Sequence, residues 1–116
     1  TLPSLRMEHI TLFSYRDEGI DITMELYFSL QGKLVFKGYD IGPKVEEFLG
    51  DSDYEYSYTI EPGEVKKLFR ILNIKTGDRM ALLEEIKNRF GGNNAYSEFG
   101  EFMTEHKIKY EALTWT

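Results

Sequence analysis

The chain has 116 residues, of which 41% are hydrophobic and 15% aromatic, and its formal net charge is −6. This length suits one domain, and the apolar fraction is large enough to form one hydrophobic core. An acidic molecule repels phosphate backbones and anionic lipid surfaces, so we expect neither nucleic acid nor membrane as a partner, and a basic protein or a cationic ligand is favoured. The sequence has no cysteine, which excludes a disulfide framework, a thiol nucleophile and cysteine-ligated zinc.

The first residues, TLPSLRM, lack the apolar core of a secretory signal. No apolar run approaches the roughly 18 residues of a membrane-spanning helix. We therefore expect a cytoplasmic protein. Residues 1–6 precede the first strand pattern, and we expect either a remnant of expression cloning or a poorly ordered native extension there. Residues 7–116 are expected to form a single domain, and the sequence predicts no particular oligomeric state.

The segment HITLFSY, residues 9–15, predicts a first strand because its side chains alternate and suit a pleated surface. Strict alternation places Ile10 and Leu12 on one side of this strand. It places Phe13 and Tyr15 on the other side.

Residues 20–28 show the clearest alternation in the sequence, with apolar side chains at every second position. LVFKGY, residues 34–39, predicts a third strand. The connections RDEG and SLQGK are short and contain glycine, as hairpin turns do. Strands joined so closely must be antiparallel, because a parallel return needs a crossover of about a dozen residues.

The segment DIGPKVEEFLGD predicts a short helix that Pro43 opens and Gly50 closes. The stretch GDSDYEYSYTI, residues 50–60, begins with polar residues suited to a turn and continues with a tyrosine at every second position. We predict a turn followed by a fourth strand.

After Glu61 the apolar residues recur at helical spacing, and three amphipathic helices are predicted within residues 61–74, 76–92 and 93–107. Gly100 lies inside the third helix and costs about 1 kcal/mol relative to alanine. The tail IKYEALTW, residues 108–115, predicts a closing strand. The expected fold is α+β, with an antiparallel sheet of about five strands covered on one face by roughly three helices, in the order βββ, short α, β, α, α, α, β.

The acidic corner of this chain is the group Asp40, Asp51, Asp53 and Glu55. Several carboxylates brought together could bind Mg²⁺ or Ca²⁺. A calcium loop of the EF-hand type needs further ligands at fixed positions, and here Tyr54 and Tyr56 interrupt the register. Turn chemistry and solvation are the favoured interpretation. The tyrosines could form an exposed recognition stripe, but burial beneath the helices is favoured.

His9 and His106 are the only histidines, and either could act as a general base if the fold placed a carboxylate beside it. A solvated surface histidine is the favoured interpretation of each. The sequence contains no HExxH, paired CxxC, GxSxG or GxxxxGK[ST] motif. We therefore predict no catalytic residue, no metal ligand and no cofactor.

The segment GKLVFKGYDIGPKVEEFLGDSDYEYSYTI, together with the ending HKIKYEALTW, resembles a group of small bacterial proteins of unassigned activity. These proteins carry a GxD[IL]GxxVE strand, a GDxDYEY segment and a closing aromatic strand. The resemblance implies a bacterial single-domain protein and supplies no catalytic residue. In size and charge the chain is also similar to immunity proteins that neutralise toxin domains, which is an analogy only.

The leading hypothesis is a non-enzymatic protein-binding module, of immunity or regulatory type, whose acidic surface binds a basic protein partner. One alternative is a small hydrolase or metal-dependent enzyme that uses the Asp51 and Asp53 corner with a histidine. Another is a mimic of nucleic acid. The predicted binding residues are Asp40, Asp51, Asp53, Tyr54, Glu55 and Tyr56.

Overall fold

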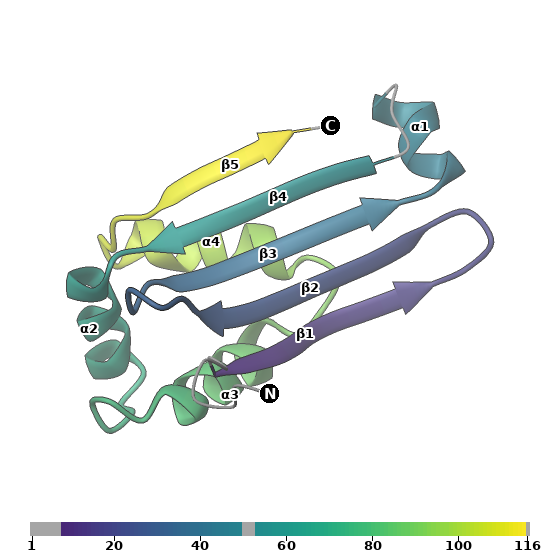
Figure 1. The fold of residues 1–116 in the computed structure, drawn as a ribbon. Helices are drawn as coiled ribbons and strands as arrows, with labels where there is room; N and C mark the ends of the chain where they lie inside the picture. The colour runs from purple at the N-terminus through teal and green to yellow at the C-terminus, as the bar shows by residue number, and fades with distance from the viewer. Residues whose placement is uncertain (1–7, 50–52, 116) are drawn as a thin grey trace.

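A computed structural model describes residues 8–49 and 53–115, so residues 1–6 and Asp51 lie outside its range. The elements in chain order are β1 His9–Arg16, β2 Asp21–Phe28, β3 Leu34–Ile41, α1 Pro43–Leu49, β4 Asp53–Ile60, α2 Pro62–Ile71, α3 Arg79–Phe90, α4 Ala95–Glu105 and β5 Glu111–Trp115. The strands form one antiparallel sheet in the order β1-β2-β3-β4-β5 (Figure 1). The predicted α+β fold and its order of elements are confirmed.

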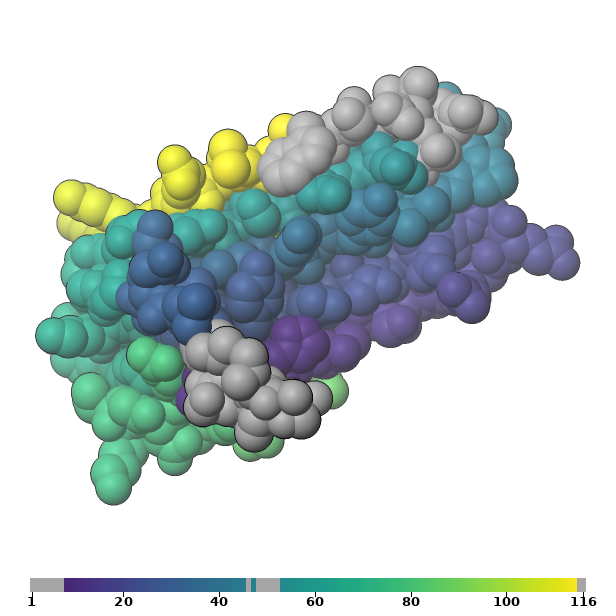
Figure 2. Space-filling model, viewed as in Figure 1, coloured from purple at the N-terminus to yellow at the C-terminus, as the bar shows by residue number. Residues whose placement is uncertain are grey.

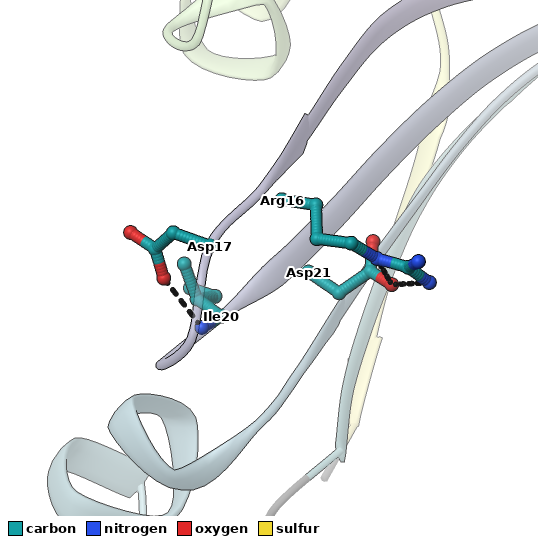
Figure 3. A network of polar contacts seen from close by, with 4 residues as sticks. All are labelled: Arg16, Asp17, Ile20 and Asp21. Atoms are coloured by element: carbon teal, nitrogen blue, oxygen red, sulfur yellow. Dashed lines mark hydrogen bonds and ion pairs between the residues drawn. The ribbon is translucent and has the colours of Figure 1, made fainter.

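The β1–β2 hairpin closes around Asp17 (Figure 3). One carboxylate oxygen of Asp17, Oδ1, accepts hydrogen bonds from the backbone N–H groups of Gly19 at 2.7 Å and Ile20 at 3.0 Å. On either side of this turn, the Arg16 guanidinium donates two hydrogen bonds to Asp21 Oδ2, at 3.1 and 2.8 Å. The polar turn predicted from RDEG is therefore closed by these side chain to backbone bonds together with a backbone hydrogen bond of 2.9 Å from the Asp17 N–H to the Ile20 carbonyl.

A β-bulge in β1 changes the faces predicted for its side chains. Thr11 pairs with Glu25 and Phe13 pairs with Met24, which leaves Leu12 as the extra residue. An extra residue shifts the alternation by one position. The prediction that Phe13 lies opposite Leu12 is therefore wrong, and both side chains contact the core. Tyr15, which pairs with Ile22, moves to the same side but stays 46% exposed at the end of the sheet.

The core lies between one face of the sheet and the helices. In Figure 1, α3 and α4 lie behind the sheet, and α2 lies at the end where β4 finishes. Alternate side chains of β2, β3 and β4 pack against apolar residues of these helices and are buried. The largest fully buried side chains are Phe28, Phe36, Phe99, Leu26, Leu34, Ile60, Leu68, Leu82, Leu83, Ile86 and Met103.

We call the opposite side of the sheet the open face. It consists of the side chains that alternate with the buried ones, and Figure 2 shows the strands at the surface there, with no described helix over them. β3 contributes Val35, Lys37, Tyr39 and Ile41 to this face. The carboxylates of this face are Asp21, Glu25, Asp53, Glu55 and Glu111. The sheet thus has one side buried under the helices and one side in contact with water, as the period-two pattern of its strands predicts.

Candidate functional site

The predicted acidic corner lies at the end of the sheet where β3 leads into α1 and β4 begins. Asp40 is the penultimate residue of β3 and pairs with Tyr54 of β4. Its neighbour Ile41 pairs with Asp53. The register therefore brings Asp40 close in space to the described part of the GDSDYEY segment, although the intervening helix α1 separates them in sequence.

The structure divides the predicted binding residues between the two sides of the sheet. Asp53 and Glu55 point to the open face, whereas Tyr54 and Tyr56 point to the helices. Asp40 lies on the helix side with the tyrosines, since its carboxylate accepts a hydrogen bond of 2.8 Å from the Tyr56 hydroxyl. These five residues form two separate groups, and the sixth, Asp51, lies outside the described residues.

The tyrosines of β4 are largely buried, which confirms the favoured interpretation of the tyrosine row. Tyr56 is 5% exposed and Tyr58 is 6% exposed. Gly38 on β3 lies directly opposite Tyr56, and a Cβ atom there would overlap the Tyr56 ring. Gly100 of α4 plays the same role for Tyr58, whose hydroxyl occupies the place of a side chain. The glycine that weakens α4 locally therefore lets α4 approach the sheet closely.

Tyr96 links α4 to β4 through both its ring and its polar groups. Its ring stacks on the Tyr58 ring with centroids 4.0 Å apart and planes inclined by 7°. The Tyr58 hydroxyl donates to the Tyr96 carbonyl at 2.9 Å, and the Tyr96 hydroxyl donates to the Ser57 carbonyl at 3.0 Å. The apolar spacing of α4 predicts that Tyr96 faces the core, but the spacing carries no signal for this reciprocal pairing.

Burial controls the ionisation of this cluster. Burial raises the pKa of Tyr56, and the hydrogen bond to Asp40 raises it further. Burial also raises the pKa of Tyr58 and of Tyr96, so all three hydroxyls remain protonated donors. For Asp40, burial raises the pKa of the carboxyl, and the Tyr56 hydrogen bond acts in the opposite direction.

A pocket of about 250 Å³ opens beside this cluster, and we call it the tyrosine pocket. Asp40, Tyr54, Tyr56 and Tyr96 contribute a carboxylate and three aromatic rings to it. The remaining lining residues are Met24, Asn93, Asn94 and Ser97. Its lining combines polar groups with aromatic rings, two kinds of surface that small-ligand sites also combine.

Neither histidine lines the tyrosine pocket. His9 Nε2 is 3.1 Å from Glu25 Oε1 on the open face, and both side chains are exposed, at 47% and 38%. His106 ends α4, with its Nδ1 atom 2.9 Å from the Phe102 carbonyl oxygen. The fold does place a carboxylate beside His9, but the pair is solvated, as expected for a surface contact.

Among the described residues, no group of three or more histidine, aspartate or glutamate side chains is placed to hold a metal ion. The hypothesis of a metal-dependent enzyme stays a prediction, since it relies on Asp51.

No helix within the described ranges has the length and apolar character needed to cross a membrane. No family model, curated protein or solved structure matches the chain.

Proposed function

We propose that the chain is a non-enzymatic protein-binding module of the bacterial cytoplasm, of immunity or regulatory type, and that its open face binds a basic protein. The observation that carries this proposal is the arrangement of side chains around β3. Ile41 is paired on one side with Asp21 and on the other with Asp53. An exposed apolar side chain is thus flanked by carboxylates from both neighbouring strands.

Two residues earlier in β3, Tyr39 has a carboxylate on one side only, since its β2 partner is Thr23. Tyr39 of β3 pairs with Glu55 of β4, and both side chains are half-buried. Interfaces commonly have an apolar or aromatic centre and a polar rim, and tyrosine is favoured at the centre. Carboxylates in the rim steer a basic partner toward the face and disfavour an acidic one. The net charge of −6 acts in the same direction over longer distances.

A charge-reversal experiment tests the proposal. The variant Asp53→Lys/Glu55→Lys reverses two carboxylates of the open face. The matched control, Glu84→Lys/Glu98→Lys, makes the same charge change at exposed positions of α3 and α4. Proteins captured by the wild-type chain from bacterial lysate are compared with those captured by each variant. A captured basic protein is then purified, and its affinity is measured by titration at several salt concentrations.

The expected result is that the open-face variant weakens binding on the order of tenfold, mainly through slower association, and that the helix control leaves affinity nearly unchanged. Added salt should reduce the difference between wild type and the open-face variant, because exposed charges are screened. Equal losses in the two variants would show that only net charge matters, and the open face would then not be the binding surface.

A further inference from the structure

The tyrosine pocket contains a carboxylate without a cationic partner. Asp40 Oδ1 accepts the hydrogen bond from the Tyr56 hydroxyl, and within the described residues Asp40 forms no ion pair. Within residues 8–49 and 53–115, no lysine, arginine or histidine lines the pocket. Burying an acidic group without a cation is costly, and burial raises the pKa of Asp40 accordingly. A ligand that brought a positive charge to Asp40 would remove this cost.

The aromatic rings beside Asp40 are inclined to one another. The Tyr54 and Tyr56 rings have centroids 5.4 Å apart and an interplanar angle of 38°. The Tyr56 and Tyr96 rings have centroids 4.8 Å apart and an angle of 67°. Inclined rings do not stack into one flat wall, so their faces point in different directions, and all three residues line the pocket. The negative faces of aromatic rings attract cations, and quaternary ammonium groups are bound by such sets of rings.

We propose that the tyrosine pocket binds a small organic ammonium group, with Asp40 as its counter-ion and Tyr54, Tyr56 and Tyr96 as its aromatic walls. The volume of about 250 Å³ is sufficient. At the roughly 30 Å³ that a water molecule takes in the liquid, it accommodates about eight non-hydrogen atoms. This site faces the helix side of the sheet and is independent of the open face.

The chemistry of the lining favours an organic ammonium over a metal ion. Calcium binds six to eight oxygen ligands, and magnesium requires an octahedral set at short distances. The pocket offers one carboxylate, neutral amides and hydroxyls, and three aromatic rings. The first turn of α4 also lines the pocket, and a helix start favours anions, although Glu98 in the same turn opposes this effect. An anion is therefore the competing ligand that the experiment must include.

The experiment compares choline chloride with 3,3-dimethyl-1-butanol, which has the same shape and no charge, and with sodium acetate. Each is titrated into the full chain at constant ionic strength and followed by calorimetry and by NMR. We expect choline to bind at least about tenfold more tightly than the neutral alcohol, because the ring faces and the carboxylate act on charge. The backbone signals of Asp40 and Tyr54 should shift with choline. Equal binding of choline and the alcohol, preferential binding of acetate, or no binding of choline would overturn the proposal.

Two variants locate the choline site. Asp40→Asn keeps an acceptor for the Tyr56 hydroxyl and removes the charge. Asp53→Asn removes the same charge at the same end of the sheet, but from the open face. We expect about a tenfold or greater loss of choline affinity in Asp40→Asn and almost none in Asp53→Asn. Equal losses of choline affinity in the two variants would show that only long-range charge matters, and this would contradict the proposal.

A third variant covers the case in which Asp40→Asn does not fold, as judged by circular dichroism. Tyr54→Leu removes one aromatic face and keeps an apolar side chain at this partly buried position. Tyr54→Leu should weaken the binding of choline more than the binding of the neutral alcohol. Equal weakening of both would argue against the cation site. Failure of the ammonium site is distinguishable from failure of protein binding by the open face. The variant Asp53→Lys/Glu55→Lys tests the open face and should leave choline binding intact.

Discussion

The two sides of β4 follow different rules although their residues alternate along one strand. On the helix side, Tyr56 and Tyr58 are buried, and each hydroxyl has a defined acceptor. On the open face, Asp53 is exposed and Glu55 is half-buried. Neighbouring residues of the DYEYSYTI strand therefore serve either packing or solvent contact. Proximity in sequence did not identify residues that share a surface.

This difference should determine how each side tolerates substitution. A buried aromatic cluster is closely packed. Its neighbouring side chains therefore cannot easily shift to accommodate an added atom or to fill the space left by a removed one. Side chains on the open face can rearrange into water at little cost. The helix side should therefore be sensitive to single atoms, and the open face should reveal its role only when a partner is present.

The largest effect is expected from Gly38→Ala. The new Cβ would overlap the Tyr56 ring, which is held by Asp40 and by the neighbouring rings of Tyr54 and Tyr96. Overpacking of this kind costs about 1–3 kcal/mol of unfolding free energy. Urea unfolding measures the loss.

Lys37→Ala is the matched control for this substitution, because it changes the preceding residue of β3 on the open face. Its effect should stay within about 0.5 kcal/mol. Combining Gly38→Ala with Tyr56→Leu should cost less than the sum of the two single changes, because the clash requires both side chains. Similar losses in Gly38→Ala and Lys37→Ala would remove the distinction between the two faces.

A smaller effect is expected from Tyr58→Phe, which deletes one oxygen atom. The lost hydrogen bond to the Tyr96 carbonyl should cost about 1 kcal/mol of unfolding free energy. Tyr27→Phe makes the same change on the open face, where the side chain is half-buried. Chemical unfolding of the two variants provides the comparison, and an equal loss in both would show that the buried hydroxyl has no special role.

Much of the fold follows from the sequence because its patterns are local. The alternation of β2 runs without interruption from Ile22 to Phe28, and the register leaves it intact. The bulge in β1 could not be predicted in the same way. HITLFSY is less regular than β2 because Leu12 and Phe13 are adjacent and both apolar. Only the pairing with β2 shows that Leu12 is the extra residue.

The candidate site is less predictable because its contacts join distant segments. Asp40 and Tyr56 are 16 positions apart, and their hydrogen bond depends on the β3–β4 register. Tyr96 reaches Tyr58 across 38 positions. Gly38 and Gly100 resemble ordinary weak points of a strand and a helix in the sequence. Their function as space for tyrosine rings becomes evident only when the opposing element is in place.

The most subtle prediction compares two aspartates at the same end of the sheet whose pKa values move in opposite directions. Burial raises the pKa of Asp40 above its ordinary value of 3.8. The hydrogen bond from the Gly19 backbone, assisted by the Tyr15 hydroxyl, lowers the pKa of Asp17 below the same value. The two carboxylates should therefore give opposite contributions to the pH dependence of unfolding.

The sign of each contribution follows from proton linkage. Folded Asp40 holds its proton more tightly than the unfolded chain does, so its stabilisation is present below pH 3.8 and is lost as the pH rises through the folded pKa. The stability of Asp40→Asn relative to wild type should therefore increase with pH over that window. Folded Asp17 contributes stability above pH 3.8 that is lost as the pH falls through its lowered pKa. Asp17→Asn should therefore lose stability relative to wild type at neutral pH and recover this difference in acid.

Urea unfolding of both variants and the wild type is repeated from acid to neutral pH. It gives, for each variant, the slope of its stability relative to wild type against pH. Slopes of the same sign for the two variants would mean that burial does not govern the Asp40 carboxyl. Choline at a saturating concentration provides a further control, because a cation beside Asp40 favours the ionised carboxylate. It should reduce the pH slope that distinguishes Asp40→Asn from wild type and leave the slope of Asp17→Asn unchanged, so that the two aspartates report separately on the pocket and on the hairpin.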